Sequence, residues 1–214
     1  MLSTLHLVRH GEVHNPDHVV YADLHGFGLS DTGRAQAASA AAHLQGELVD
    51  VLVSSPLQRA RETAAPIAAA LGVEPLLDDR LTEWHLGRRW AGVGWEELPE
   101  RFPGELEAYL ATPTTLPFAP EQIDGVASRV ASVVSDLGIA HPGGTAVLVS
   151  HQDPIQAVRL VLTRIDLGRL HDDKPNHASV ITLTANQGGW IETSVWTPQE
   201  PSSPFPPVKG NERT

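Results

Sequence analysis

The sequence predicts a three-layer α/β/α sandwich in which a mostly parallel central sheet carries helices on both faces. Two observations point to this fold class. Three short runs rich in Val and Leu are typical of buried strands, and each is followed, directly or after a loop, by a helical pattern. Strands that alternate with helices favour a parallel sheet that is covered on both sides.

Five segments are expected to form strands. They span residues 5–8, 51–53, 147–149, 179–184 and 190–196. The first three are the buried runs, and short polar or glycine-containing segments follow them. The last two strands flank a Gln-Gly-Gly sequence at residues 187–189, which is typical of a hairpin turn.

Four helices are expected from the period of their apolar residues. They cover residues 34–44, 56–71, 126–137 and 154–162. A Ser-Asp pair can cap the first helix. Pro56 fits the first turn of the second helix and Gly72 its end, while Gly138 is expected to end the third and Pro154 to open the fourth.

The chain is expected to be one α/β domain over residues 1–196, because its 214 residues suit a single core that needs no disulfides. Residues 84–120 are rich in Trp, Gly, Pro and Glu, and we expect them to form an insert over the strand ends. Trp84, Trp90 and Trp95 are expected to pack this insert against the sheet. Residues 197–214 hold five prolines and few apolar side chains, which predicts a flexible tail.

The composition of the chain disfavours some classes of partner and excludes some kinds of catalytic site. A formal net charge of −11 disfavours nucleic acid and membrane surfaces as partners, because both require a basic face. The absence of cysteine excludes thiolate metal sites and cysteine nucleophiles, and it fits a cytoplasmic protein. No signal peptide or membrane-spanning segment is predicted. The sequence does not indicate an oligomeric state.

Chemically useful residues follow the three buried strands. In an open parallel sheet, ligands bind beyond the carboxyl ends of the strands. The side chains expected to meet there are Arg9, His10, Ser54, Arg59 and His151. Cations this close together would repel one another, so an anion is expected between them. The planar guanidinium of arginine suits the binding of phosphoryl oxygens. The same cations would keep an imidazole neutral, and a neutral imidazole is a nucleophile.

The chain resembles the histidine phosphatase (phosphoglycerate mutase-like) superfamily through motifs in the family's order. They lie at residues 7–12 (LVRHGE), 29–37 (LSDTGRAQA), 54–64 (SSPLQRARETA), 81–83 (LTE, followed by Gly87), 149–151 (VSH) and 176–180 (NHASV). The resemblance covers roughly residues 5–184. The motif at residues 54–64 is highly specific. Each of the other motifs is weak by itself, but their occurrence in the family's order makes the resemblance strong.

The resemblance implies a role for each matching residue. His10 would accept the phosphoryl group. Glu83 would protonate the leaving oxygen and then activate water. The residues that would hold the phosphoryl oxygens are Arg9, Asn15, Arg59 and His151. Phosphoryl transfer by such a site needs neither a metal ion nor another cofactor.

Two questions stay open at this stage, namely which carboxylate is the proton donor and what role Glu121 has. Asp79, Glu96 and Glu97 are nearby carboxylates that compete with Glu83 for the role of proton donor. Many family members carry Gly-Glu-Ser before the helix that begins here near residue 122, whereas this chain has Ala-Pro-Glu-Gln at residues 119–122. Whether Glu121 replaces that motif is undecided.

The function predicted from these residues is metal-independent hydrolysis of a small phosphomonoester through a phosphohistidine on His10. A phosphoglycerate mutase acting through the same site is the nearest alternative, although its branch usually has a longer chain. A non-catalytic module that binds a phosphorylated ligand is a third possibility. The sequence does not identify the substrate.

Overall fold

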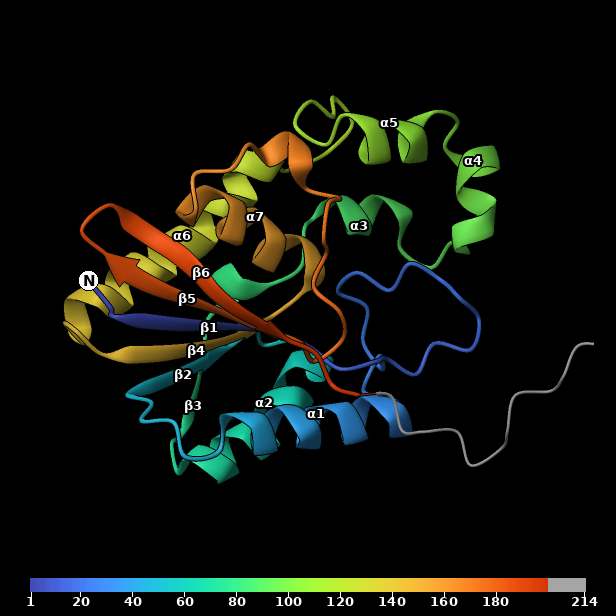
Figure 1. The fold of residues 1–214 in the computed structure, drawn as a ribbon. Coiled ribbons are helices and arrows are strands. Elements are labelled where there is room, and N and C mark those ends of the chain that lie inside the picture. The colour runs from blue at the N-terminus through green and yellow to red at the C-terminus, as the bar shows by residue number, and fades with distance from the viewer. Residues whose placement is uncertain (200–214) are drawn as a thin grey trace, which may run out of the picture.

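The computed structural model describes residues 1–199 and contains one six-stranded mixed sheet in the order β3-β2-β4-β1-β5-β6. Helices cover both of its faces (Figure 1). The predicted three-layer sandwich is therefore confirmed. The predicted domain limit at residue 196 stays a prediction, and residues 200–214 of the expected tail lie outside the described residues.

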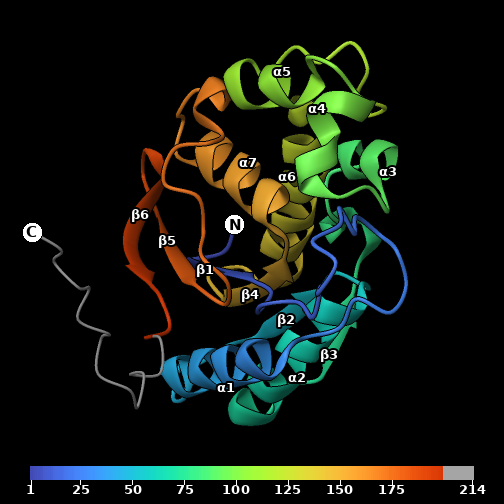
Figure 2. The ribbon, with the colours of Figure 1, turned by 90° about the vertical axis from the view of Figure 1, so that its right-hand side faces the viewer.

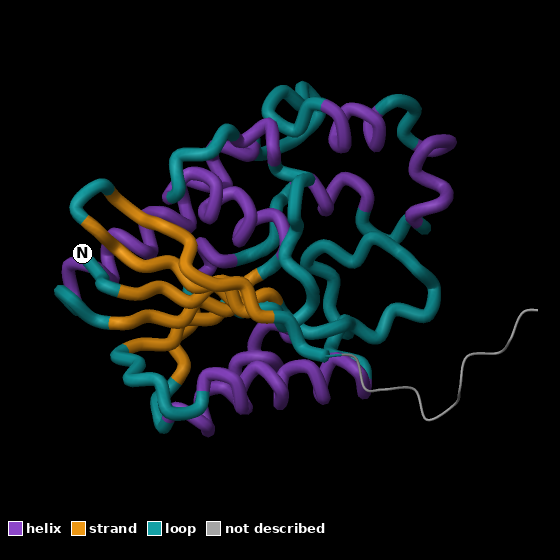
Figure 3. Tube along the Cα trace, viewed as in Figure 1, coloured by secondary structure: helices purple, strands orange, loops and turns teal. Residues whose placement is uncertain are grey.

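Four neighbouring strands form the parallel part of the sheet. They are β1 (Thr4–Arg9), β2 (Val51–Ser54), β3 (Pro75–Leu77) and β4 (Thr145–Ser150). In the register of the central strands, Arg9 lies beside Ser150 and Ser54 lies beside Val149. The carboxyl ends of β1, β2 and β4 therefore meet at one edge, where the loops gather (Figure 3). The edge strand β3 was not predicted.

The late hairpin completes the sheet beside β1. Strand β5 (Val180–Asn186) runs antiparallel to β1, and β6 (Gly189–Trp196) runs antiparallel to β5. The predicted hairpin is confirmed, with its turn at residues 187–188. The sheet thus has an antiparallel pair of strands on one side of its parallel part.

The long helices form the two outer layers (Figure 2). Helices α1 (Asp31–Leu44) and α2 (Gln58–Leu71) cover one face, and α6 (Ile123–Ala140) and α7 (Gln152–Leu162) cover the other. Alanines of α1 and α2 pack on the sheet in one apolar cluster, and valines of α6 pack on the opposite face in a second cluster. Small alanine side chains let the first pair of helices lie close to the strands.

Several predicted helix limits were wrong. Gly138 lies inside α6 rather than after it, because a Cβ atom there would come within 2.9 Å of Met1 Cα, so glycine serves close packing of the N-terminus. Helix α2 begins two residues after Pro56. Helix α7 begins two residues before Pro154, which sits in its first turn, where proline loses no helical hydrogen bond. Gly72 does end α2, with a φ of 68°.

The insert forms small helices beyond the strand ends. Its helices are α3 (Leu86–Trp90), α4 (Leu98–Arg101) and α5 (Glu105–Ala111), and short 3₁₀ turns lie at Asp79–Leu81, Trp95–Glu97 and Leu167–Arg169. The predicted position over the strand ends is confirmed (Figure 1). Trp84 and Trp90 are buried in a separate apolar cluster with residues of α6 and α7, rather than against the sheet. Trp95 is 42% exposed.

The described residues include no helix of the length and apolar character that crossing a membrane would require.

Candidate active site

His10 is the first residue after β1 and is only 1% exposed. Its backbone N–H donates to the carbonyl of Ser150 over 3.0 Å, which ties it to the end of the neighbouring strand. Its ring Nδ1 lies 2.7 Å from the Gly11 carbonyl oxygen, so Nδ1 carries the proton and donates. The other ring nitrogen, Nε2, therefore keeps its lone pair.

Gly11 permits close packing beside His10. A Cβ atom at this position would lie 2.5 Å from the carbonyl oxygen of Gly33, so no larger residue fits without moving the backbone. The Gly11 N–H donates to Thr63 Oγ1 over 3.0 Å, which anchors the turn after β1 to helix α2. These contacts fix the direction in which the His10 ring points.

Arg59 is the second residue of α2 and is 1% exposed. Its Nη2 donates to the Ala22 carbonyl over 2.7 Å, and its guanidinium lies 4.7 Å from the centre of the Tyr21 ring. The aromatic face and the carbonyl both favour the cation in this buried position. The first turn of α2 adds the partial positive charge of a helix N-terminus.

Arg9 reaches the same region from the end of β1. Its Nη1 donates to the Pro175 carbonyl over 2.8 Å, and its Nη2 lies 2.9 Å from His177 Nε2. Because arginine can only donate, His177 Nε2 accepts. Burial and the Arg9 charge lower the pKa of His177 to about 4, which keeps that ring neutral.

His151 directly follows β4, and its ring centre lies 5.1 Å from that of His10. Its Nε2 is 2.8 Å from Ser55 Oγ. Ser54, which was expected at this centre, instead turns its hydroxyl to the Ser55 carbonyl over 2.9 Å. The serine that contacts this cluster is therefore Ser55 rather than Ser54.

Three buried nitrogens of this cluster lack a hydrogen-bond partner within the part of the chain that the structure describes. They are Arg9 Nε, Arg59 Nε and His151 Nδ1. A buried polar group without a partner costs about 1–3 kcal/mol. An anion with several acceptor oxygens placed among them would satisfy them, which makes this cluster a site for a phosphoryl group.

The electrostatics favour a neutral nucleophile. Burial, followed by the charges of Arg59 and Arg9, lowers the pKa of His10 well below its usual value. Burial and the Arg59 charge also lower the pKa of His151. Imidazoles in this setting are unprotonated near neutral pH, so His10 Nε2 is available for attack.

Glu83 follows the 3₁₀ turn at Asp79–Leu81 and lines the same cavity as His10. The cavity has a volume of about 270 Å³. One Glu83 oxygen accepts a hydrogen bond from the Trp84 N–H over 2.8 Å. Burial and the charge of Asp153 raise the pKa of Glu83 to about 7, so it can carry a proton near neutral pH.

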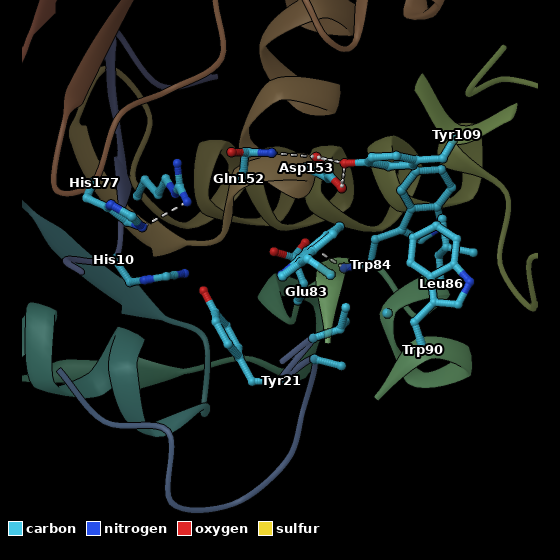
Figure 4. A pocket seen from close by; sticks show the side chains of 15 residues that line it. His10, Tyr21, Glu83, Trp84, Leu86, Trp90, Tyr109, Gln152, Asp153 and His177 are labelled. Atoms are coloured by element: carbon cyan, nitrogen blue, oxygen red, sulfur yellow. Dashed lines mark hydrogen bonds between the residues drawn. The ribbon is translucent and has the colours of Figure 1, made fainter. Parts of the chain in front are cut away.

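Competing carboxylates lie elsewhere. Asp79, Glu96 and Glu97 do not line this cavity, whereas Glu83 does. Figure 4 shows the Glu83 side chain in the same space as His10 and Tyr21. The geometry therefore favours Glu83 as the proton donor.

Glu121 does not reach the cavity. It pairs with Arg129 over 2.8 Å, and its second oxygen lies 3.4 Å from His85 Nδ1. Arg129 in turn donates to the carbonyls of Arg80, Thr82 and Glu83 over 2.6, 2.7 and 3.1 Å. Together Glu121 and Arg129 fix the backbone that carries Glu83, which gives Glu121 a supporting position.

Asn15 lies beside the cluster of Arg9, His10, Arg59 and His151, and its side chain is hydrogen-bonded to Val19 instead. Its amide nitrogen donates to the Val19 carbonyl over 2.9 Å, and its oxygen accepts from the Val19 N–H over 3.2 Å. The side chain borders a neighbouring cavity that shares Tyr21 and His177 with the main one. Asn15 Nδ2 keeps a second N–H, but the side chain does not line the main cavity.

Sequence reasoning missed several residues of the cavity wall. Asp153 and Tyr109 face each other there, with the phenol oxygen 3.1 Å from one carboxylate oxygen. His177 lies in the motif at residues 176–180 but had no assigned role. Asp153 could have been suspected because it follows His151 by two residues, whereas Tyr109 comes from the insert and gave no signal.

Fold and site together define an α/β protein that can hold a phosphoryl group against a neutral imidazole. A carboxyl group that can carry a proton near neutral pH lies in the same cavity (Figure 4). Residues 5–197 match the family model of the histidine phosphatase superfamily, branch 1. The chain belongs to this superfamily and is a phosphomonoester hydrolase.

Three proteins illustrate the similarity of this chain to others. An uncharacterised protein of Mycobacterium tuberculosis is 38% identical over 184 residues, covering 85% of this chain and 88% of that protein. Phosphoserine phosphatase 1 of Hydrogenobacter thermophilus is 34% identical over 164 residues, covering 76% and 77% of the two chains. The native structure of mycobacterial glucosyl-3-phosphoglycerate phosphatase superposes with a TM-score of 0.81 at 28% identity, covering 92% of this chain and 99% of that one.

Proposed function

We propose that the enzyme hydrolyses a small phosphomonoester through a phosphohistidine on His10, without a metal ion. The observation that carries the proposal is the His10 ring, whose Nδ1 proton is committed to the Gly11 carbonyl. Its free Nε2 lies in a cluster where arginine and histidine nitrogens lack partners among the described residues.

In the first step, His10 Nε2 attacks phosphorus in line with the leaving oxygen. A P–N bond forms as the P–O bond to the alcohol breaks. Arg9, Arg59 and His151 hold the three other oxygens, and the two arginines balance their charge. Glu83 gives its proton to the leaving oxygen, so the alcohol departs neutral and Glu83 becomes a carboxylate.

In the second step, the Glu83 carboxylate takes a proton from water as the water oxygen attacks phosphorus. The P–N bond breaks and its electron pair returns to His10 Nε2. Inorganic phosphate is released, and Glu83 is protonated again for the next substrate. Each group thus ends in its starting state.

Metal independence is a testable consequence. Arg9 and Arg59 supply the charge stabilisation that a divalent ion provides in other phosphoryl-transfer sites, and His151 adds a hydrogen bond. Phosphate release from nitrophenyl phosphate is expected to continue at its normal rate after exhaustive chelation and dialysis. Loss of activity on chelation, with recovery on addition of a divalent ion, would contradict this part of the proposal.

A second test separates hydrolysis from isomerisation. If water reaches the phosphohistidine readily, 3-phosphoglycerate and a bisphosphoglycerate primer should give phosphate release and little 2-phosphoglycerate. Both products can be followed in one assay by phosphorus NMR. Isomerisation much faster than phosphate release would instead favour the mutase.

The proposed partner is a small phosphorylated metabolite. Relatives named for phosphoserine and for glucosyl-3-phosphoglycerate act on molecules of this kind, and the cavity of about 270 Å³ suits a ligand of that size. We also propose that the enzyme works in the cytoplasm, which its cysteine-free sequence fits.

A further inference from the structure

Asp153 lies in the first turn of α7, two residues after His151, and is 8% exposed. It lines the active-site cavity. Its hydrogen-bond donors among the described residues are the Tyr109 hydroxyl at 3.1 Å and the Gln152 amide at 3.3 Å. Both donors are neutral, and within residues 1–199 no ion pair includes this carboxylate. A buried carboxylate in such a setting strongly favours an added cation.

The cavity is electrically divided. Arg9 and His10 line the part where the phosphoryl group is held, and in Figure 4 Asp153 lies on the far side of Gln152 from His177. A phosphate dianion would be repelled by Asp153. Only the alcohol part of the substrate can therefore occupy the space beside this carboxylate.

Aromatic rings surround that space. Trp84, Trp90 and Tyr109 line the cavity. The Tyr109 ring centre lies 5.7 Å from that of Trp90, at an interplanar angle of 89°, and 5.9 Å from that of Trp84. Aromatic rings attract ammonium groups and also offer apolar surface to a short carbon chain. Carboxylate and aromatic rings together form the usual surroundings of a bound ammonium group.

We propose that Asp153 selects phosphomonoesters of amino alcohols by accepting a hydrogen bond from the ammonium group of the substrate. The inference rests on the proposed function, because the phosphate end must sit on Arg9, Arg59 and His151. A carboxylate on the alcohol part would meet the Asp153 charge and is disfavoured. Arg9 and Lys174 lie within range of the Asp153 charge, but neither forms an ion pair with it among the described residues, and Lys174 does not line the cavity.

The test compares phosphoethanolamine with propyl phosphate, which has a methyl group in place of the ammonium. The kcat/KM ratio of the two substrates is measured for the wild type and for Asp153→Asn. The variant should lower this ratio about 10- to 100-fold, the range for loss of a hydrogen bond to a charged group. Any change that the variant causes in Glu83 affects both substrates and cancels in the ratio.

Two controls accompany the variant. Asp124→Asn changes an exposed aspartate in the first turn of α6 and should leave the ratio unchanged. Turnover of nitrophenyl phosphate shows that Asp153→Asn is folded and active. The wild type provides an independent measurement, since phosphoethanolamine should exceed phosphoserine in kcat/KM by at least about 10-fold, because only the latter places a carboxylate near Asp153.

An unchanged ratio in active Asp153→Asn, or phosphoserine turned over as well as phosphoethanolamine by the wild type, would overturn the inference. Either result leaves hydrolysis through His10 intact. If the wild type released phosphate from none of these substrates, nor from nitrophenyl phosphate, the proposed function would fail and this inference with it. The two failures are therefore distinguishable.

Discussion

His10→Ala is expected to abolish turnover, with kcat for every phosphomonoester falling by about 10⁴–10⁶-fold, as for other enzymes that lose their nucleophile. The reason is that Nε2 of this ring forms the only covalent bond between enzyme and phosphorus in the proposed mechanism. Initial rates of phosphate release measure the effect. The variant should still fold, because alanine removes one ring and keeps the backbone N–H bond to Ser150.

His25→Ala is the matched control. His25 is exposed and does not line the active-site cavity, so its removal should change kcat less than about twofold. If His10→Ala kept more than a few per cent of the wild-type rate while His25→Ala was normal, another group would have to be the nucleophile. His151, whose ring centre is 5.1 Å away, would be the next residue to test.

Glu83→Gln is expected to slow single-turnover phosphorylation by an alkyl phosphate about 10²–10⁴-fold, the usual size of a general acid–base effect. Glutamine keeps the shape and the hydrogen bond from Trp84 N–H but cannot give up a proton. Nitrophenyl phosphate should lose far less, because its leaving group departs without a proton. Single-turnover rates are required, since a limiting second step would slow both substrates alike.

The pH dependence follows from the same residue. With a pKa of about 7, Glu83 carries its proton below neutral pH and loses it as the pH rises. Phosphorylation by an alkyl phosphate should therefore decline above pH 7, and Glu83→Gln should lack this decline. Glu107→Gln, at an exposed position of α5, is the control. Equal losses for both substrates would mean that Glu83 supports the structure only.

Much of this site could be predicted because parallel strands place distant residues together. His10 and His151 are far apart in the chain, yet each follows a strand, and those strands are neighbours in the sheet. Arg59 is found in the same way, since it lies in the first turn of the helix after β2. The position of these residues follows from the topology alone.

The far side of the cavity depends on contacts that no local pattern encodes. Tyr109 comes from the insert, and its hydroxyl meets Asp153 only after the apolar cluster of Trp84 and Trp90 has packed against α6 and α7. Asn15 shows the opposite case, because a plausible phosphate ligand is engaged with the backbone of its own turn. Long-range packing decides the first outcome, whereas contacts within a single turn decide the second.

Helix limits were misjudged for a related reason. Gly138 has the sequence features of a helix end, but glycine is required there by the close approach of Met1. The same residue type ends α2 at Gly72, where φ is positive and an added Cβ atom would meet open space. Only the three-dimensional contacts distinguish a glycine needed for space from one needed for backbone conformation.

The most direct test of the central claim is chemical trapping of the intermediate. Wild-type enzyme is mixed with a ³²P-labelled phosphomonoester and quenched in alkali within milliseconds, and the labelled peptide is mapped. The account predicts label that is acid-labile and base-stable, located on His10, and formed at least as fast as the alcohol is released. Rapid alcohol release with no label on the protein, or label on another residue, would contradict the account.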